Sequence, residues 1–555
     1  MTGRLPAPAP GESPWMGRVL ICVALVLGAV LAARGISDEG AVSLQGDMPR
    51  YMMNGVFIRD FLAAPVFSID GILTYAQHYF ARYPALSLGH HPPVLPVLLV
   101  PFYAIFGVSI LAGRVAIAAC FVLAIWLLYT LARRQYGTTV GGWAALLLAS
   151  HPFMVRYSQE VLSEMPTVVA VLAAFNALLR FRDRARASDY LLFVGLAASS
   201  LASKQLAVFV FPAYVLLLLM DGGWARLRQR HVWGWTIAGA SLVILLVVVT
   251  VALSPYNVGI AVNVILNGVG IAAWREIVQP VLQEHLRPSL LYGVVTAAVV
   301  SVLVRDRRAW LAASWVVAVL AGVVFVTGPY DVARYGIYAV PAYCLIAASL
   351  AAYSRTGVRS LGAHAVLLVI FALQVRAGAA VEPVGGRGYE QAAVSVLAGP
   401  AAPTVLYSAS VDTGYFVFFV RKHDAERRLI VLRSDKLLTT SFMGDPSLTE
   451  RIRDRADIYP LLDRYGTRFV VIEDRPTGSD VLDWLNEEVK GDRFIEHERI
   501  PIETRDRRLQ QVDLVIYEYK DAKPGDPNAE LDMQLPIVDR EIRVKLSDLQ
   551  PPTAP

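Results

Sequence analysis

Charged residues and cysteines are both scarce in this sequence. Asp, Glu, Lys and Arg make up only 17% of the 555 residues, whereas 55% are hydrophobic, which excludes an ordinary soluble domain and indicates a membrane protein. The three cysteines, Cys22, Cys120 and Cys344, all lie inside apolar runs. This placement offers neither a disulfide framework nor a CxxC metal site, so we expect them to be packing residues.

The sequence also lacks a continuous basic face and an evident internal repeat. Its net charge of +5 arises from short basic clusters that separate apolar runs. A nucleic-acid-binding protein would instead gather basic residues along one polar face. Nucleic acid is therefore not an expected partner, and membrane topology explains the clusters better.

Eleven apolar runs are predicted to be spanning helices, at 18–34, 110–131, 139–154, 165–180, 189–203, 205–220, 233–253, 288–304, 309–328, 335–353 and 360–378. Arginine clusters follow every second run, near residues 133, 180–186, 226–230, 305–308 and 355–359. The positive-inside rule places these clusters and residues 1–17 in the cytoplasm. The first run could be a secretory signal, but the many later runs favour an uncleaved helix in the cytoplasmic (inner) membrane.

One apolar stretch, 93–107, does not fit this alternation. It follows "SLGHHPP" and contains prolines that disfavour an uninterrupted helix, so we expect it to lie along or dip into the outer leaflet. The first external loop then covers 35–107, and its length indicates a function. Within this loop, residues 46–62 are predicted to form a partly amphipathic helix in the membrane interface.

The chain changes character after residue 379. β-rich strings such as "TVLYSAS" and "TRFVVIED" alternate with helical ones such as "VLDWLNEEV", which predicts an extracytoplasmic α/β domain over 379–530 without a Gly-rich phosphate loop. Residues 531–555 are rich in proline and charge and are expected to be an extended arm. The predicted fold is thus a helical membrane domain over 18–378 followed by this external domain.

Ionisable residues of the first external loop are candidates for chemistry. Asp47 suits a general base that takes a proton from an acceptor, although it could simply cap its helix, and Asp38 and Glu39 are rival carboxylates. A histidine at His90 or His91 could bind a phosphate or, with a nearby carboxylate, a metal ion. Both rings could also serve only as interfacial anchors.

Three further ionisable residues abut apolar helices on the external side. Glu164 opens one helix, Lys204 lies in a short break between two, and Arg334 stands beside Tyr335 at the mouth of another. Charged groups at membrane depth are costly and usually mark a substrate path. Arginine can bind two phosphate oxygens with its fork of donors. The alternatives are that Glu164 complements a helix dipole and Lys204 only reaches to the interface.

The order of these motifs resembles the GT-C class of integral membrane glycosyltransferases. More narrowly, it is similar to the protein O-mannosyltransferases and lipid A aminoarabinose transferases, a glycosyltransferase 39-like family. The resemblance covers roughly 17–350 and rests on "DMPRY", "HHPP", "LSEMP", "SK" and "ARYGIYAVP" in this order. Members usually carry a second acid where Met48 stands here, whereas Asp47, Arg50 and Tyr51 match.

The resemblance implies transfer of a hexose or pentose from a polyprenyl-phosphate donor, with inversion, to a glycan, protein or lipid acceptor outside the membrane. Asp47 would be the base. Donor-phosphate contacts fall to His90, His91, Lys204, Arg334 and Tyr335. Acceptor or metal positioning falls to Arg50, Tyr51 and Glu164, and a divalent metal ion stays open, with His91 and Glu164 as candidate ligands.

Two other classes of protein would explain part of the sequence. A transporter or flippase of lipid-linked glycans would carry charged or helix-breaking residues in mid-membrane and repeated halves, whereas runs such as "SLVILLVVVTVAL" have no charge. A non-catalytic membrane anchor for the external domain would have little need of ionisable residues at several separate helix mouths. A transporter and a membrane anchor are therefore the alternatives to a transferase.

Overall fold

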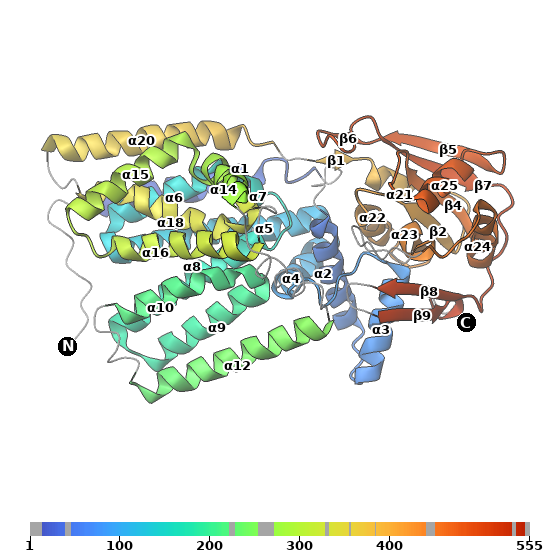
Figure 1. Ribbon diagram of the computed structural model, residues 1–555, viewed down its shortest axis with the longest axis horizontal. Helices are drawn as coiled ribbons and strands as arrows, with labels where there is room; N and C mark the ends of the chain where they lie inside the picture. The colour runs from blue at the N-terminus through green and yellow to red at the C-terminus, as the bar shows by residue number, and fades with distance from the viewer. Residues whose placement is uncertain are drawn as a thin grey trace.

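The computed structural model of the chain describes residues 14–38, 46–220, 228–253, 271–327, 332–353, 357–382, 385–439, 450–535 and 540–549. A mostly helical part is followed by an α/β part, and the two lie end to end along the long axis (Figure 1). The predicted fold class, a polytopic helical membrane protein with a C-terminal α/β region, is confirmed.

Seven helices of the described residues are long and apolar enough to cross a membrane. Five of them lie in α1 (Pro14–Ala33), α5 (Ile110–Tyr136), α8 (Glu164–Arg184), α12 (Arg230–Leu253) and α20 (Gly357–Ala379). The other two are Val278–Leu303, which ends with α15 (Arg287–Leu303), and Ala309–Val326, which begins with α16 (Ala309–Gly322). The runs expected at 139–154, 189–203, 205–220 and 335–353 form shorter apolar helices. These are α6 (Thr138–Ser150), α9 (Ala187–Ser203), η1 (Gln205–Val210) with α10 (Phe211–Leu219), and η4 (Ile337–Ala339) with α18 (Val340–Ala348) and α19 (Leu350–Tyr353).

Helices α1 and α6 approach closely through glycine. A Cβ on Gly142 would lie 2.7 Å from Leu20 Cβ and 2.9 Å from the backbone oxygen of Gly17, so a larger residue would push the helices apart. Small residues at such contacts are typical of helices that associate in membranes. Of the cysteines, Cys120 and Cys344 are buried, whereas Cys22 is exposed on α1.

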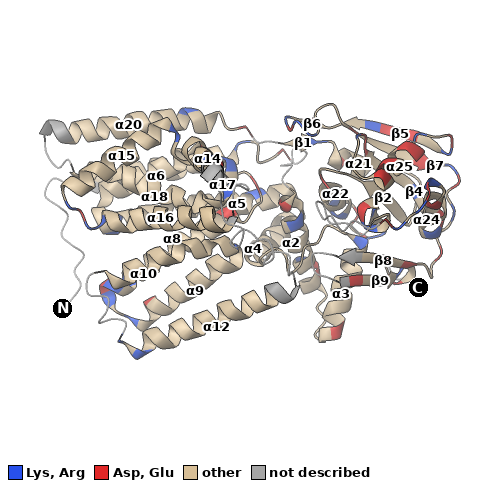
Figure 2. Cartoon of the chain, viewed as in Figure 1, with Lys and Arg blue, Asp and Glu red and all other residues tan. Residues whose placement is uncertain are grey.

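Charge is distributed unevenly over the two parts. Figure 2 shows that the helices are mostly free of charged residues along their lengths, whereas Lys and Arg gather at the end of the helical part farthest from the α/β part. Basic residues stand there in the last turns of α5 and α8. Further charges gather where the helical part faces the α/β part.

The first external loop folds into α2 (Asp47–Ala63), α3 (Ile69–Arg82) and α4 (Val94–Phe106). Helix α4 is about 20 Å long, shorter than the roughly 30 Å hydrocarbon core, and its position along the outer leaflet stays a prediction. The helix expected over 46–62 forms, but it is less exposed than a partly amphipathic helix would be. Helix α2 is mostly buried against α4 and against a helix of the α/β part, because apolar residues occur on all its sides. Exposed apolar side chains lie instead at its end, including Leu62, Phe67 and Ile69.

Short elements connect the helices at the junction between the two parts. They are α7 (Pro152–Tyr157), α14 (Ile271–Pro280), the π-helical turn η2 (Val281–Leu286), the π-helical turn η3 (Val323–Thr327) and α17 (Val332–Tyr335). Figure 1 shows α7 and α14 at this end of the helical part.

The α/β part contains a five-stranded sheet of order β3-β2-β4-β7-β5. Its strands are β2 (Thr404–Ser408), β3 (Ile430–Arg433), β4 (Thr467–Glu473), β5 (Phe494–Pro501) and β7 (Asp513–Tyr519), and β2 pairs in parallel with β3 and β4. The helices of this part are α21 (Tyr389–Ala398), α22 (Tyr415–His423), α23 (Ser434–Leu437), α24 (Ile458–Tyr465) and α25 (Asp480–Glu488), besides the single turn η5 (Arg455–Asp457). Strands β1 (Gly386–Arg387) and β6 (Glu503–Thr504) form a small second pair.

The C-terminal segment differs from the extended arm expected over 531–555. Strands β8 (Glu530–Leu535) and β9 (Arg540–Lys545) pair antiparallel, and α26 (Leu546–Leu549) follows. The segment alternates apolar and polar residues, and the apolar set of Leu531, Met533, Ile542 and Val544 is buried. This alternation allows the apolar residues of both strands to pack on one face, which stabilises the strand pair. The content of proline and charge alone does not indicate these strands.

Candidate functional site

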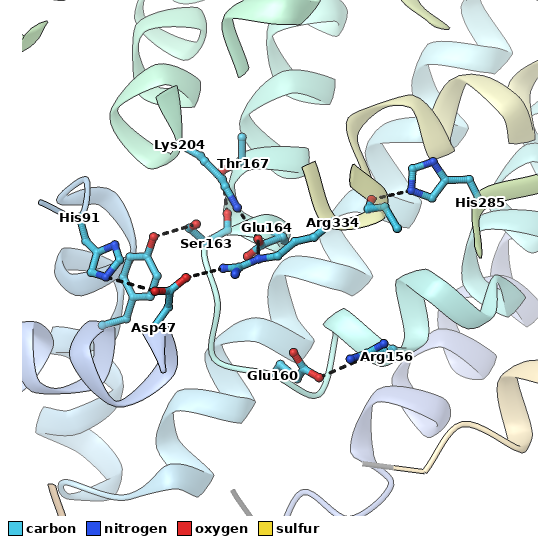
Figure 3. Close-up of polar contacts among 12 residues, drawn as sticks. Asp47, His91, Arg156, Glu160, Ser163, Glu164, Thr167, Lys204, His285 and Arg334 are labelled. Atoms are coloured by element: carbon cyan, nitrogen blue, oxygen red, sulfur yellow. Dashed lines mark hydrogen bonds and ion pairs between the residues drawn. The ribbon is translucent and has the colours of Figure 1, made fainter. Parts of the chain in front are cut away.

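A buried cluster of ion pairs lies at the junction of the two parts. The Arg334 guanidinium bridges two carboxylates, with Nη2 3.0 Å from Asp47 Oδ2 and Nε 2.5 Å from Glu164 Oε1. The Lys204 ammonium contacts the same oxygen of Glu164. Figure 3 shows the four side chains converging from separate elements. The structure thus brings together four residues singled out in the sequence.

Each member stands at the end of an element or in a break. Asp47 is the first residue of α2 and Glu164 the first of α8, where the positive helix end favours an acid. Lys204 occupies the extended break between α9 and η1, and Arg334 lies in the short helix α17. Because helix ends and breaks meet at this level, the charges sit beside the apolar helices instead of within them.

Exposure separates the members of the cluster. The side chain of Glu164 is fully buried, and those of Lys204 and Arg334 are 9% and 8% exposed, whereas Asp47 is 33% exposed. Two cations face two carboxylates, which compensates charges that would be costly if buried alone. Asp47 is therefore the member that a ligand can reach most readily.

His91 lies on the other side of Asp47. Its Nε2 is 3.7 Å from Asp47 Oδ1, and its ring lies 4.4 Å from the Tyr51 ring, whose hydroxyl donates to Ser163 Oγ at 3.1 Å. The rings of His90 and His91 are 4.7 Å apart. The histidine pair and Tyr51 are thus part of the same site.

The charges around Asp47 set its protonation. Burial raises the pKa of Asp47, but nearby positive charges, His91 when protonated and Arg334, outweigh burial and hold the pKa below its usual range. Burial lowers the pKa of His91 to about 3, so this ring is neutral at pH 7. With His91 neutral, Arg334 is the charge that favours the ionised form of Asp47 most strongly, followed by Arg50 and Lys204.

Two other predicted site residues lie at the edge of the cluster. Lys204 Nζ is 5.0 Å from the centre of the Tyr335 ring, a distance typical of a cation–π contact. The charge of Arg50 interacts with Asp47 on one side and with Arg433 of the α/β part on the other.

Asp38, one of the two rival carboxylates, does not join the cluster. The Asp38 carboxylate pairs with Arg387 of the α/β part, and its backbone oxygen accepts from Arg114 at 2.7 Å. Glu39 lies outside the described residues. Among the carboxylates of the first external loop that the structure describes, Asp47 is the one that contacts Arg334.

Small polar residues that the sequence analysis did not single out complete the site. Ser163 accepts from Tyr51, and the Thr167 hydroxyl, one turn into α8, donates to Ser203 Oγ at 2.8 Å. Serine and threonine next to apolar helices are common, so their residue types do not distinguish them from ordinary packing residues. The one sequence signal is that Ser163 and Ser203 directly precede Glu164 and Lys204.

The described residues do not fit the metal ion considered from the sequence. They contain no group of three or more His, Cys, Asp or Glu side chains that could hold a metal. Glu164, a candidate ligand, has one oxygen occupied by both Lys204 and Arg334. The side chains of this site are therefore not assigned as metal ligands.

Comparisons with known proteins find one matching family model and several structures of similar fold. The family model for dolichyl-phosphate-mannose-protein mannosyltransferase matches residues 90–253. No curated protein sequence matches the chain. A crystal structure of ArnT from Cupriavidus metallidurans bound to undecaprenyl phosphate is similar with a TM-score of 0.52 and 13% identity, covering 91% of this chain and 99% of that chain.

The apo structure of the same ArnT gives a TM-score of 0.51 and 13% identity, covering 91% of this chain and 98% of that chain. With 91% of this chain covered, the similarity extends over both the helical part and the α/β part. Together with the family match, it shows that the chain has the fold of the GT-C glycosyltransferases.

Proposed function

We propose that the protein is a glycosyltransferase that moves a sugar from a polyprenyl-phosphate donor to an acceptor at the outer face of the cytoplasmic membrane. The observation that carries this proposal is the bridge that Arg334 makes between Asp47 and Glu164 beside Lys204. In this bridge two cations of the kind that binds phosphate lie next to a partly exposed carboxylate, which supports the proposal. The GT-C fold supports the same reading, and the similar ArnT structure holds undecaprenyl phosphate.

The charge balance of the cluster suggests how a donor binds. The phosphate of a polyprenyl-linked sugar is an anion that competes with Asp47 for Arg334, whereas Glu164, fully buried, stays on both cations. Arginine and lysine bind phosphate through charge-assisted hydrogen bonds. When Arg334 turns to the phosphate, Asp47 loses its main counter-charge, and its pKa rises toward the usual range.

This exchange prepares Asp47 for general base catalysis. The acceptor hydroxyl oxygen attacks the anomeric carbon, the bond from this carbon to the phosphate oxygen breaks, and the hydroxyl proton passes to Asp47. The configuration at the anomeric carbon inverts. The polyprenyl phosphate leaves with the bonding electrons, and Arg334 and Lys204 stabilise its added charge, so no separate general acid is needed.

The other site residues have supporting roles in this proposal. The binding site for the donor phosphate is lined by His90, His91 and Tyr335. Because His91 is neutral, it contacts the phosphate through hydrogen bonds and not through charge. Tyr51 and Arg50 position the acceptor beside Asp47. Arg50 also faces the α/β part, so the acceptor lies between the two parts of the chain.

The proposed topology puts residues 1–17 in the cytoplasm and both the first external loop and the α/β part outside. The arginines at the far end of the helical part support this orientation through the positive-inside rule. Residues 18–378 form the catalytic membrane domain, and residues from 379 onward form the external domain. The sugar is a hexose or pentose, and the acceptor is a glycan, a protein or a lipid.

The test uses the full-length protein in membranes with a panel of radiolabelled polyprenyl-phosphate sugars. We expect label to move to a membrane or cell-envelope acceptor from at least one donor with the wild type and not with Arg334→Gln at equal abundance. Arg308→Gln, which removes a paired arginine far from the cluster, serves as the control and should keep activity. Absence of transfer from every donor would contradict the proposal.

A further inference from the structure

A buried histidine contacts the backbone next to Arg334. His285 lies in the π-helical turn η2, its side chain is fully buried, and its Nε2 is 2.6 Å from the backbone oxygen of Ala333. A carbonyl oxygen can only accept, so Nε2 carries the hydrogen and donates. Figure 3 shows this contact immediately beside the Arg334 side chain.

A second buried histidine, His151, forms a hydrogen bond with the backbone of His285. His151 stands between α6 and α7, and its Nε2 is 2.7 Å from the backbone oxygen of His285, so it also donates to a carbonyl. The Nδ1 atoms of both rings are buried without a hydrogen-bond partner in the described part of the chain. This pattern fits two neutral rings with their hydrogen on Nε2. The chain of bonds runs from His151 through His285 to Ala333.

The turn between these two contacts has an unusual backbone. The six residues of η2 are π-helical, and Arg287, which follows, has a φ of 47°, a region that non-glycine residues rarely adopt. Single π-helical turns occur frequently at functional sites. The Phe153 ring of α7 packs 4.9 Å from the His285 ring. Packing and hydrogen bonding together therefore hold His285 in an otherwise unfavourable segment.

Arg334 needs such support because it must face two carboxylates at once. Its guanidinium is fixed by Glu164 and Asp47, but these contacts do not fix the backbone from which the side chain extends. The carbonyl of Ala333 is the backbone group directly before Arg334, and His285 binds it from a different helix. A shift of this carbonyl would move the guanidinium relative to Asp47.

We propose that His285, fixed by His151, is a positioning residue that sets the backbone of Arg334 for phosphate binding. The inference rests on the proposed function for its consequence, the binding of a polyprenyl phosphate, but not for the structural relationship itself. Neither histidine touches the donor. Their effect passes through the Ala333 carbonyl to Arg334.

Two measurements on the full-length protein in detergent test this role. The first is amide hydrogen exchange over residues 332–340, which reports the order of the Arg334 backbone without requiring activity. The second is the binding of polyprenyl phosphate itself. In His285→Leu we expect at least about tenfold faster exchange in this segment and about tenfold weaker binding, since a buried hydrogen bond is lost.

Conservative variants separate positioning from a general packing effect. The amide nitrogen of Gln occupies a place similar to Nε2, so His285→Gln should keep exchange and binding near the wild type, whereas His285→Asn is too short and should behave like His285→Leu. His364→Leu is the matched control, because it removes a histidine bonded at 3.0 Å to Trp143 elsewhere in the helical part. This control should leave both measurements unchanged.

The outcomes distinguish the inference from the proposed function. Faster amide exchange in His285→Leu, together with no binding of polyprenyl phosphate by the wild type, would contradict the proposed function. The same result would still support the role of His285 in positioning the Arg334 backbone. Unchanged exchange in His285→Leu would overturn the positioning role. If His285→Leu does not fold, the Gln and Asn variants decide, because equal behaviour of these two would also overturn it.

Discussion

Asp60 of α2 and Arg421 of α22 form a buried ion pair that joins the first external loop to the α/β part. Arg421 Nη2 and Nε lie 2.7 Å and 3.2 Å from Asp60 Oδ2, and Tyr79 donates to the same oxygen at 2.8 Å. Arg427 adds a second cation at 3.0 Å. Because α2 begins with Asp47, this pair connects the α/β part directly to the helix that carries the proposed base.

Removing this carboxylate should destabilise the junction. In Asp60→Asn two arginines lose their buried counter-charge, and breaking a buried pair from one side typically costs about 3–5 kcal/mol. We expect a clear drop in thermal stability in detergent. Asp70→Asn is the control, since Asp70 is exposed in the first turn of α3 and should change stability little. Equal melting temperatures for the two variants would contradict the role of the pair.

The buried His91 should make stability depend on pH. Its pKa falls from 6.5 to about 3 on folding, so between these values the unfolded chain binds a proton that the folded chain does not. Stability is therefore lost as pH falls below about 6.5, by about 1.4 kcal/mol per pH unit and about 3 kcal/mol at pH 4. Unfolding of the wild type and of His91→Gln should be measured from pH 7 to 4.

The expected result is a flatter pH dependence in His91→Gln, because this side chain does not titrate. His423→Gln provides a comparison with a partly exposed histidine that pairs with Glu390. A wild-type slope that persists unchanged in His91→Gln would show that another group governs the acid sensitivity.

The account also predicts a specific loss for Lys204. Lys204→Gln keeps length and polarity but removes one of the two cations, so polyprenyl phosphate should bind about tenfold more weakly. Glu164 would retain Arg334 as its partner, so the fold should survive. Isothermal titration or intact-protein mass spectrometry can measure the affinity. Equal affinity of wild type and variant would place the phosphate elsewhere.

The broad architecture could be predicted because it depends on local patterns. Apolar runs separated by arginine clusters indicate helices, and the proline-containing run before Phe106 forms the short helix α4. Its position along the outer leaflet stays a prediction. The period-2 pattern after residue 379 indicates strands. These signals depend on neighbouring residues, so a single sequence contains them.

The site could be predicted only in part. Asp47, Glu164, Lys204 and Arg334 were recognisable as charges at helix mouths, and the structure brings them together. Asp38 could not be excluded beforehand, because its partner Arg387 is distant in the sequence. The burial of α2 also escaped prediction, because its partners α4 and α22 are brought to it by tertiary packing and not by a pattern within 46–62.

The histidine contacts were beyond sequence reasoning altogether. His285 acts through its own backbone oxygen and that of Ala333, and no side-chain pattern encodes which carbonyl a buried ring will face. The π-helical turn η2, which carries His285, has no characteristic amino-acid composition by which it could be predicted.

A comparison of Asp47 with Asp38 shows which carboxylate is the catalytic base. Transfer of radiolabelled sugar from polyprenyl-phosphate donors should be measured for Asp47→Asn and Asp38→Asn at equal abundance in membranes. General base catalysis contributes about 10²–10⁴-fold, so Asp47→Asn should lose activity by about this factor while Asp38→Asn retains most of it. Full activity in Asp47→Asn, or a loss confined to Asp38→Asn, would contradict the account.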